Sequence, residues 1–581
     1  QHPAVTVQLT GTPVASPVCK VNVVPAAAGG FGGFLGRVLQ FGNVTVGHDK
    51  TLPITIQNVG SASCTIGGLK FTNGLGSVGG TICLGGTKCG DYQVTSTPAS
   101  SIAPGQSTTI GITFSPRDTN QLPQLPSVYL NFHSGDPNVT SECQQNVPPD
   151  AAAGCMDVGM SGQGDVSNLA VLPSDLDFGL TTIGCNSPQE NISLYNTGVS
   201  TPIHVTGITL DPVAAPFYIS APPTPFAVPP QGKVVITVKY KPSQASKETA
   251  TLNVASDASN ATSNNPYVTV ALSGTGTTNK NQVDTFQQAA RPTVDLLMII
   301  DNSGSMQDYQ SSLSQQGPSF ITQALQANAD FHIGVTSTEN DKTDTPDSNA
   351  SYRDPIHVGG LWGRPPLIDN GDANGASDFA ANIKVGTCCS DDRESGLESA
   401  WHVLTPNADQ TAPPQGSKGF LRDDARLVML ALSDENDQSH GSTAFYTDFF
   451  KQVKGQYNAG LVSFNAIVGD PGSGCNNGGI TADSGDRYVD VVNATGGKWY
   501  SICSADWGQV ARDLALGAFQ GRVQFALSRT ADPATVVVTL NGNPQSPNID
   551  YTFDQPTNSV IFKTVPPSGS TIVVSYDALC F

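Results

Sequence analysis

Four short landmarks occur twice in the N-terminal half of the chain, in the same order. Around them apolar and polar residues alternate over short runs such as residues 234–240, which is typical of strands with one buried face. Such strands, separated by turns, predict all-β sandwiches. The spacing shrinks in the second copy, so we expect a sandwich with loop insertions over residues 1–165 and a smaller one over 166–278. The matched landmarks are residues 39–42 (LQFG) with 176–179 (LDFG), 56–60 (IQNVG) with 194–198 (LYNTG), 114–116 (FSP) with 240–242 (YKP), and 160–162 (MSG) with 272–274 (LSG).

The charge of the chain is low and unevenly placed. Only 13% of the residues are charged, against roughly 25% in an average soluble protein. The formal net charge is −20, and residues 281–519 hold 30 of the 48 acidic and 14 of the 28 basic residues. Nucleic acids and anionic membranes need a basic face, so neither is an expected partner. No apolar run reaches the ~18 residues of a membrane-spanning helix, so we expect no transmembrane segment.

Twelve cysteines are spread thinly along the chain, and none forms a CxxC pair. Zinc ribbons and thioredoxin-type redox sites are therefore not expected. An even number of cysteines in a weakly charged chain favours structural disulfides and an exported protein. Cys475 and Cys503 could pair with each other, whereas the adjacent Cys388 and Cys389 are expected to have two separate partners.

The pattern changes after a polar segment, residues 279–292, that we interpret as a linker. Residues 294–300 are a near-continuous apolar run, as in a strand buried on both faces of a parallel sheet. Strands and helices then alternate, which predicts a doubly wound, Rossmann-like α/β domain over residues 293–519. Residues 520–581 return to alternation and predict a small C-terminal β module. Within the α/β domain we expect strands at 331–336, 426–432 and 461–468, and helices at 309–329, 394–404, 444–453 and 507–515.

The first buried strand ends in a group of oxygen-bearing side chains, Asp301, Ser303 and Ser305. Ligand sites in open α/β sheets lie at the carboxyl ends of the strands. One carboxylate and two hydroxyls are hard oxygen ligands, too few for a complete cage, and they suit Mg²⁺, Mn²⁺ or Ca²⁺ with waters or a partner's carboxylate in the remaining positions. The alternative is that these residues only cap the following helix.

These residues resemble the metal-ion-dependent adhesion site of the von Willebrand factor A family, D-x-S-x-S followed by a Thr and an Asp from two further loops. The resemblance implies that Asp434, at the end of the apolar run 427–432, is the third-loop ligand. The second loop departs from the family pattern, because no Thr stands at the expected offset. Asp391 is our best substitute, with Asp392 and Ser390 as alternatives. A carboxylate there would favour a resident Ca²⁺.

Two further resemblances cover much of the chain. The repeated landmarks are similar to immunoglobulin-like domains of the ASPM–SPD-2–Hydin (choice-of-anchor D) type, which usually act as spacers or docking modules. Residues 433–437, 446–454, 466–470 and 500–503 resemble a subfamily of exported bacterial von Willebrand A proteins, some of which are surface adhesins.

Together these features predict a secreted or bacterial cell-surface protein that binds by means of a divalent cation and is not an enzyme. The resemblance implies a protein or glycan ligand whose acidic group completes the coordination of the cation. The alternative is a self-assembling subunit of an extracellular filament or coat, which the uncharged run of residues 21–36 would suit. The long insertion at 339–387 could shape the ligand surface, and its acidic stretch 369–378 is expected to be a solvated loop.

Overall fold

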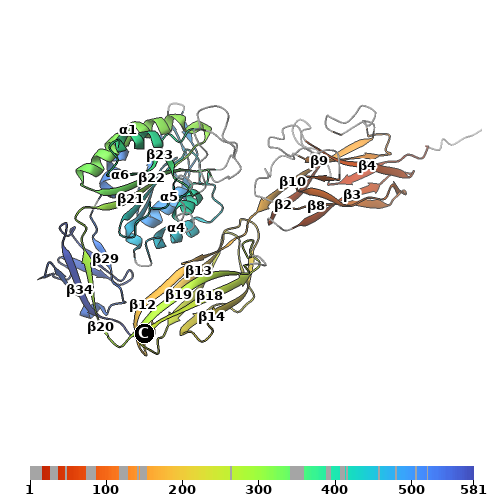
Figure 1. The fold of residues 1–581 in the computed structure, drawn as a ribbon. Coiled ribbons are helices and arrows are strands. Elements are labelled where there is room, and N and C mark those ends of the chain that lie inside the picture. The colour runs from red at the N-terminus through yellow and green to blue at the C-terminus, as the bar shows by residue number, and fades with distance from the viewer. Residues whose placement is uncertain are drawn as a thin grey trace, which may run out of the picture. The chain divides into compact units, whose positions relative to one another are not determined.

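The fold is known from a computed structural model (Figure 1). It divides into two compact units, Gln1–Ser167 with Gly198–Thr201, and Asn168–Thr197 with Pro202–Phe581. Most of the regular structure is strand, arranged in several sheets. The structure describes residues 16–25, 37–45, 49–73, 87–116, 128–139, 143, 154–261, 265–339, 359–387, 394–405, 412–413, 416–455, 458–477, 480–503, 507–519 and 521–581.

The first unit contains two sheets that share one apolar core. Their strand orders are β1-β3-β8-β6-β5 and β2-β10-β9-β4-β7. Ile54 and Ile110 of one sheet pack in the same cluster as Phe71 and Leu130 of the other, so the two sheets form a sandwich. The strands are β1 (Val21–Val24), β2 (Val38–Thr45), β3 (Lys50–Asn58), β4 (Cys64–Asn73), β5 (Lys88–Cys89), β6 (Tyr92–Ser96), β7 (Ser101–Ile102), β8 (Ser107–Phe114), β9 (Val128–Ser134) and β10 (Cys155–Asp165).

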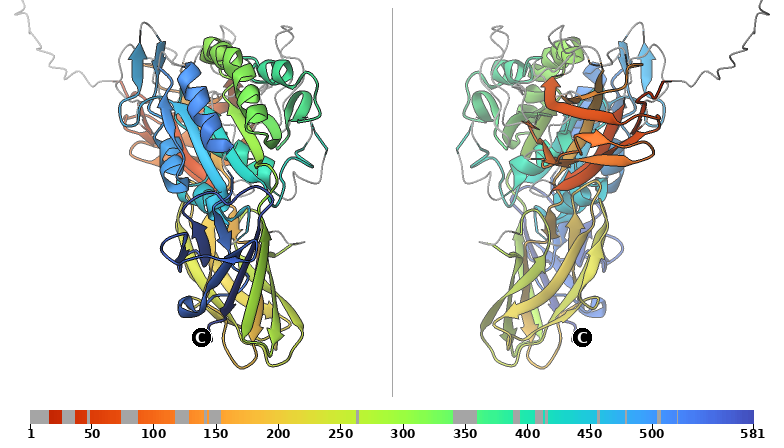
Figure 2. Two further views of the ribbon diagram at one scale, coloured as in Figure 1. Left: turned by 90° about the vertical axis from the view of Figure 1, so that its left-hand side faces the viewer. Right: turned by 90° about the vertical axis from the view of Figure 1, so that its right-hand side faces the viewer.

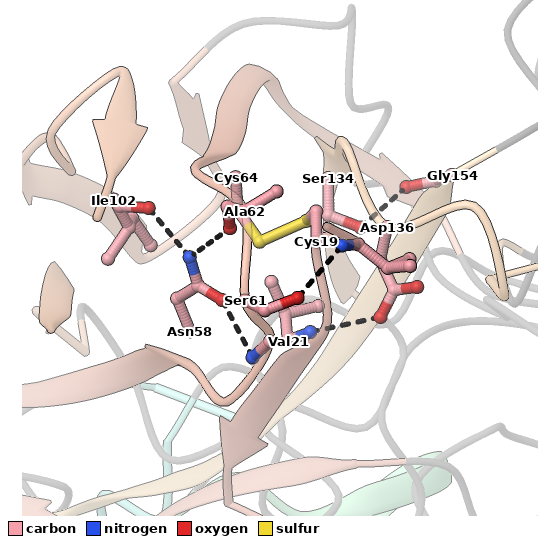
Figure 3. Close-up of a disulfide and its surroundings, with 12 residues drawn as sticks. Cys19, Val21, Asn58, Ser61, Ala62, Cys64, Ile102, Ser134, Asp136 and Gly154 are labelled. Carbon is pink, nitrogen blue, oxygen red and sulfur yellow. Dashed lines mark hydrogen bonds between the residues drawn. A yellow bond between two sulfur atoms is a disulfide. The ribbon is translucent and has the colours of Figure 1, made fainter. Parts of the chain in front are cut away.

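A disulfide between Cys19 and Cys64 fastens the first described segment to this sandwich (Figure 3). Two residues further on, the N–H of Val21 donates to the carboxylate of Asp136 at 2.9 Å. Strand β1 then pairs antiparallel with β3. The beginning of the uncharged run therefore belongs to a sheet, and residues 26–36 of that run lie outside the described residues.

The second unit begins with another two-sheet sandwich, called the second sandwich below. Its sheets have the orders β11-β13-β17-β15 and β12-β19-β18-β14-β16, and they share one core around Ile192, Leu252 and Val270. The strands are β11 (Leu169–Leu172), β12 (Asp175–Thr182), β13 (Glu190–Asn196), β14 (Ile203–Asp211), β15 (Phe217–Ser220), β16 (Phe226–Val228), β17 (Lys233–Tyr240), β18 (Lys247–Ser256) and β19 (Tyr267–Thr277).

The repeated landmarks contact one another inside each sandwich. A Cβ added to Gly162 would lie 2.8 Å from the ring of Phe114, and one added to Gly274 would lie 2.6 Å from the ring of Tyr240. Real Cβ atoms do not approach this closely, so the SG landmark needs glycine because the aromatic ring of the F/Y-x-P landmark packs against it. The repeated landmarks thus correspond to the same contact, an aromatic ring packed against a glycine, in each sandwich.

A six-stranded sheet follows in the second unit, with the order β23-β22-β21-β24-β25-β28. Its strands pair in parallel, apart from β23, which joins β22 antiparallel. The predicted central strands are confirmed almost residue for residue, because a fully buried parallel strand has an apolar sequence that is easy to recognise. The strands are β21 (Thr293–Ile300), β22 (Asp330–Ser337), β23 (Trp362–Asp369), β24 (Arg426–Leu432), β25 (Val462–Val468) and β28 (Trp499–Ser501).

Helices cover both faces of this sheet (Figure 2). Leu296 and Met298 of β21 belong to the cluster with α1, α2 and α6, whereas Leu297 and Ile299 belong to the cluster with α3, α4 and α5. The central strand is therefore buried on both sides. The helices are α1 (Gln307–Gln326), α2 (Gly375–Asn382), α3 (Gly396–Leu404), α4 (Thr443–Gln452), α5 (Asp486–Thr495) and α6 (Trp507–Ala518), with the short hairpin β26 (Cys475–Asn477) and β27 (Ile480–Ala482) between β25 and α5.

The segment 279–292 is not a simple linker, and this corrects the sequence prediction. Residues 281–287 form strand β20 (Asn281–Gln287), which pairs over its whole length with β34 (Thr571–Asp577) near the end of the chain. The C-terminal β module therefore includes a strand from before the α/β layer. Its sheets are β20-β34-β30-β31 and β29-β33-β32. The other strands are β29 (Gln524–Ala526), β30 (Val537–Leu540), β31 (Asn543–Pro544), β32 (Tyr551–Asp554) and β33 (Ser559–Phe562).

Disulfides join distant parts of the chain, as the cysteine count predicts. The expected bond between Cys475 and Cys503 is present. Cys143 pairs with Cys155, and Cys185 pairs with Cys580 across 395 residues. Cys388 and Cys389 lie outside the described residues. Within the described part of the chain, no helix is both long and apolar enough to cross a membrane.

Candidate metal centre

Asp301 follows the central strand β21 and is completely buried. Its carboxylate accepts hydrogen bonds from the N–H of Ser303 at 2.7 Å and from the hydroxyl of Ser433 at 2.6 Å. Its own N–H donates to the carbonyl of Leu432, the last residue of β24, at 2.9 Å. The two central strands thus end side by side, and Asp301 is held in place between them.

The two serines and Asp434 lie next to one another at this edge of the sheet. The Ser303 and Ser305 hydroxyl oxygens are 3.1 Å apart, and the Ser305 hydroxyl donates to Oδ1 of Asp434 at 3.1 Å. Ser303 stands at the start of the short 3₁₀ helix η3 (Gly304–Met306), yet its side chain makes no capping hydrogen bond. The capping alternative therefore does not account for the Ser303 side chain, and four of the five proposed ligands come together.

The predicted second-loop ligand, Asp391, lies outside the described residues, as do its alternatives Ser390 and Asp392. The described end of that loop instead brings Glu394 to the site, only 6% exposed. The side-chain amide of Gln438 donates to both Glu394 and Glu435, at 3.1 Å in each case. Sequence reasoning missed Glu394 and Glu435. The available signal was an acidic residue directly before a helix and another directly after Asp434.

Gln310 on α1 connects the first and second loops. Its side-chain amide donates to the carbonyl of Asp301 at 2.8 Å and to the carbonyl of Gly386 at 2.9 Å, and its side-chain oxygen accepts the N–H of Gly386 at 3.2 Å. These bonds are short and Gln310 is buried. The start of the second loop, which follows helix α2, is therefore fixed relative to Asp301.

The carboxyl groups at the site raise one another's pKa. Burial, with the charges of Asp301 and Glu435, raises the pKa of Glu394 to about 9. Burial raises the pKa of Asp434 to about 6; the charge of Asp301 adds to this, while the hydrogen bond from Ser305 opposes it. Burial also raises the pKa of Asp301, against the hydrogen bonds from the serines. In the described residues, no lysine, arginine or histidine forms an ion pair with these carboxylates.

This arrangement fits a hard divalent cation. Carboxylate and hydroxyl oxygens are the ligands that Mg²⁺ and Ca²⁺ prefer. A cation would neutralise buried negative charge that has no ion-pair partner among the described residues. The set depends on serine hydroxyls: no group of three or more His, Cys, Asp or Glu side chains within the described ranges has a geometry that could hold a metal ion. A cation here would use two carboxylates and two hydroxyls.

The acidic stretch 369–378 closes a turn between β23 and α2. Oδ1 of Asp369 accepts the N–H of Gly371 at 2.6 Å, and Oδ2 of Asp372 accepts the N–H of Asp369 at 2.8 Å. These carboxylates therefore serve the turn itself; Asp369 is exposed and Asp372 is half-buried. The expected loop ends at Asn374, because residues 375–378 begin helix α2.

Comparisons with known proteins assign this chain to no family. No protein-family model matches the chain, and no curated protein sequence does. Among solved structures, a von Willebrand factor type A protein from Catenulispora acidiphila is similar at 10% identity and a TM-score of 0.24, over 65% of this chain and 66% of that one.

Two further solved structures match other spans. The ASH/PapD-like domain 7 of human CEP192 matches at 13% identity and a TM-score of 0.15, over 28% of this chain and 97% of that one. The pilus adhesin SpaC of Lactobacillus rhamnosus GG matches at 11% identity and a TM-score of 0.23, over 58% of this chain and 41% of that one. At these TM-scores we draw no conclusion about function from the likeness.

Proposed function

We propose that this chain is a cation-dependent binding protein of the cell surface or extracellular space. Its α/β layer acts as a von Willebrand factor A domain with a metal-ion-dependent adhesion site, and its two sandwiches act as immunoglobulin-like spacers. Asp301, Ser303, Ser305 and Asp434 hold Mg²⁺ or Ca²⁺. Glu394 lies beside them as a carboxyl group that ionises only once the cation is bound, and Asp391 is the second-loop ligand that the sequence predicts. An acidic group of a protein or glycan ligand completes the coordination.

One observation carries this proposal. The Ser305 hydroxyl lies within hydrogen-bond distance of both the Ser303 hydroxyl and the Asp434 carboxylate, and the Asp301 carboxylate accepts the backbone N–H of Ser303, all at the carboxyl edge of a parallel sheet. Their negative charge has no basic counterpart among the described residues. We propose binding rather than catalysis, because holding a cation and an anionic group requires neither a nucleophile nor a general base. The disulfides suit an oxidising, extracellular environment.

The test measures cation binding and cation-dependent retention together. Calorimetry of the full chain with Ca²⁺ and Mg²⁺ gives the affinity. A biosensor surface of carboxymethylated dextran then supplies immobilised acidic groups. Because the chain carries a net charge of −20, such a surface repels it non-specifically. Retention that requires the cation and is reversed by EDTA therefore reports a cation bridge.

Ser305→Ala is the test variant, and Ser319→Ala, on the exposed side of α1, is its matched control. We expect Ser305→Ala to lose cation binding and retention, and Ser319→Ala to keep both. A wild-type chain that binds neither cation refutes the proposal. Assembly into large particles at micromolar concentration with and without EDTA, measured by sedimentation, would instead support the alternative of a structural subunit.

A further inference from the structure

The second sandwich contacts the α/β layer at two places, the end of the proposed third metal loop, residues 433–442, and the helix α4 that follows it. Near the end of that loop, the carbonyl of His440 accepts a hydrogen bond from the side chain of Gln231 at 3.1 Å. On the next helix, α4, the carboxylate of Asp448 accepts from Lys233 at 3.0 Å and from the hydroxyl of Tyr195. Tyr195 lies on strand β13, Lys233 on strand β17, and Gln231 in the turn before β17.

The contact is buried as well as polar. Tyr195 is only 1% exposed, and its ring meets the ring of Phe445 on α4 edge-on, with 5.4 Å between the ring centres. Leu172 of the second sandwich belongs to the same apolar cluster as Leu397 of α3. The second sandwich therefore packs against helices α3 and α4 through buried side chains.

The third loop is stiff between the metal ligand Asp434 and these contacts. Asp437, fully buried, forms an ion pair with Arg487 at 3.0 Å and accepts the N–H of Leu397 at 3.0 Å. Further along, Glu398 accepts both the N–H and the ring nitrogen of His440 at 3.1 Å. The loop that carries Asp434 is thus hydrogen-bonded along its length, up to the residues that the second sandwich contacts.

We propose that docking of the second sandwich on α4 regulates the affinity of the metal centre. The docked sandwich holds the third loop in the arrangement that places Asp434 beside Ser305, so docking and cation binding stabilise each other. Linkage makes this coupling reciprocal. A change that loosens the docked sandwich lowers the affinity for the cation, and a bound cation stabilises the docked arrangement. The inference rests on the proposed function of the metal centre and adds that its affinity responds to a neighbouring domain.

The test variant is the double substitution Tyr195→Phe with Lys233→Met, which removes both hydrogen bonds to Asp448 and keeps the apolar bulk. Lys241→Met is the matched control, because Lys241 is an exposed lysine of the same sandwich and its loss changes the charge equally. Calorimetry with Ca²⁺ on the full chain should show an affinity about 2- to 30-fold weaker in the double variant. The control should match the wild type.

A second measurement needs no cation. Hydrogen exchange of residues 433–452 in EDTA should be at least about twofold faster in the double variant than in Lys241→Met, because undocking removes restraints on the loop and on α4. Lys233→Met alone, which leaves the buried ring of Tyr195 untouched, serves if the double variant unfolds, and the same two readouts apply to it.

The outcomes separate the two proposals. If the wild type binds no cation, the proposed function fails. If the wild type binds a cation, Asp301→Ala does not, and the docking variant binds within twofold of the wild type or more tightly, the metal centre stands and the coupling is overturned. Unchanged exchange of residues 433–452 likewise overturns the coupling.

Discussion

Loading the metal centre should release protons, and the number can be worked out from the carboxyl groups. Asp434 has a pKa of about 6 and Glu394 a pKa of about 9 in the cation-free protein. At pH 6, Asp434 is therefore about half protonated and Glu394 almost fully protonated. A cation takes only ionised carboxylates as ligands, so its binding expels these protons.

The expected release at pH 6 is about half a proton from Asp434, and up to about one more if Glu394 becomes ionised beside the cation. Both pKa values are raised. At any pH below its pKa, each carboxyl group is mostly protonated, and its proton competes with the cation. The affinity should therefore increase as the pH rises from 5 to 7, by up to about tenfold per pH unit for each proton released. By pH 8 the contribution of Asp434 should have vanished.

Calorimetry of Ca²⁺ binding in buffers with different ionisation enthalpies measures the release directly. Glu394→Gln should lower the proton release at pH 6, and Asp434→Asn should remove about half a proton while weakening cation binding. Asp378→Asn, a carboxylate of α2 away from this edge of the sheet, is the control and should behave as the wild type. Cation binding that releases no protons at pH 6, with an affinity constant between pH 5 and 8, would refute the reasoning.

Three further predictions concern stability, each followed as a melting transition by calorimetry. Gly274→Ala should cost about 1–3 kcal/mol, because the new Cβ meets an aromatic ring, whereas Gly207→Ala, with its nearest neighbour 3.8 Å away, should be close to neutral. Arg487→Met should cost about 3–5 kcal/mol, because it leaves a fully buried carboxylate unpaired. Replacing Cys475 and Cys503 by serine should cost about 3–4 kcal/mol in the chain-entropy model. Losses below about 0.5 kcal/mol would contradict each account.

The elements that could be predicted from the sequence are those whose own apolar residues indicate that they are buried. Strands β21 and β24 are apolar apart from Thr293, Asp295 and Arg426, because both of their faces are covered by helices. Helix α5 was missed because it is rich in β-branched valine, which favours strands locally, although Tyr488, Val491 and Val492 form its buried stripe. Strands such as β23 also went unrecognised, inside the insertion at 339–387.

Strand β20 shows a different limit. Its sequence is polar, and Val283 is 52% exposed, so nothing local distinguishes it from a linker. It becomes a strand because β34, almost 300 residues later, pairs with it. Pairing between segments this far apart depends on the whole fold and is not visible in the alternation of seven residues.

The residues of the metal centre also fall into those that could be predicted from the sequence and those that could not. Asp301, Ser303 and Ser305 share one tight loop, so their spacing alone indicates that they converge. Glu394 and Glu435 come from two other loops, and their closeness to Asp301 depends on how those loops leave the sheet. Asp391 stays a prediction.

Crystals of the full chain soaked with Mn²⁺ or Ca²⁺, examined by anomalous scattering, test the central claim most directly. We predict one cation with the hydroxyl oxygens of both Ser303 and Ser305 within about 2.0–2.6 Å, and Asp301 and Asp434 bound directly or through water. Saturating cation that leaves both serine hydroxyls more than about 4 Å from any metal would contradict the account.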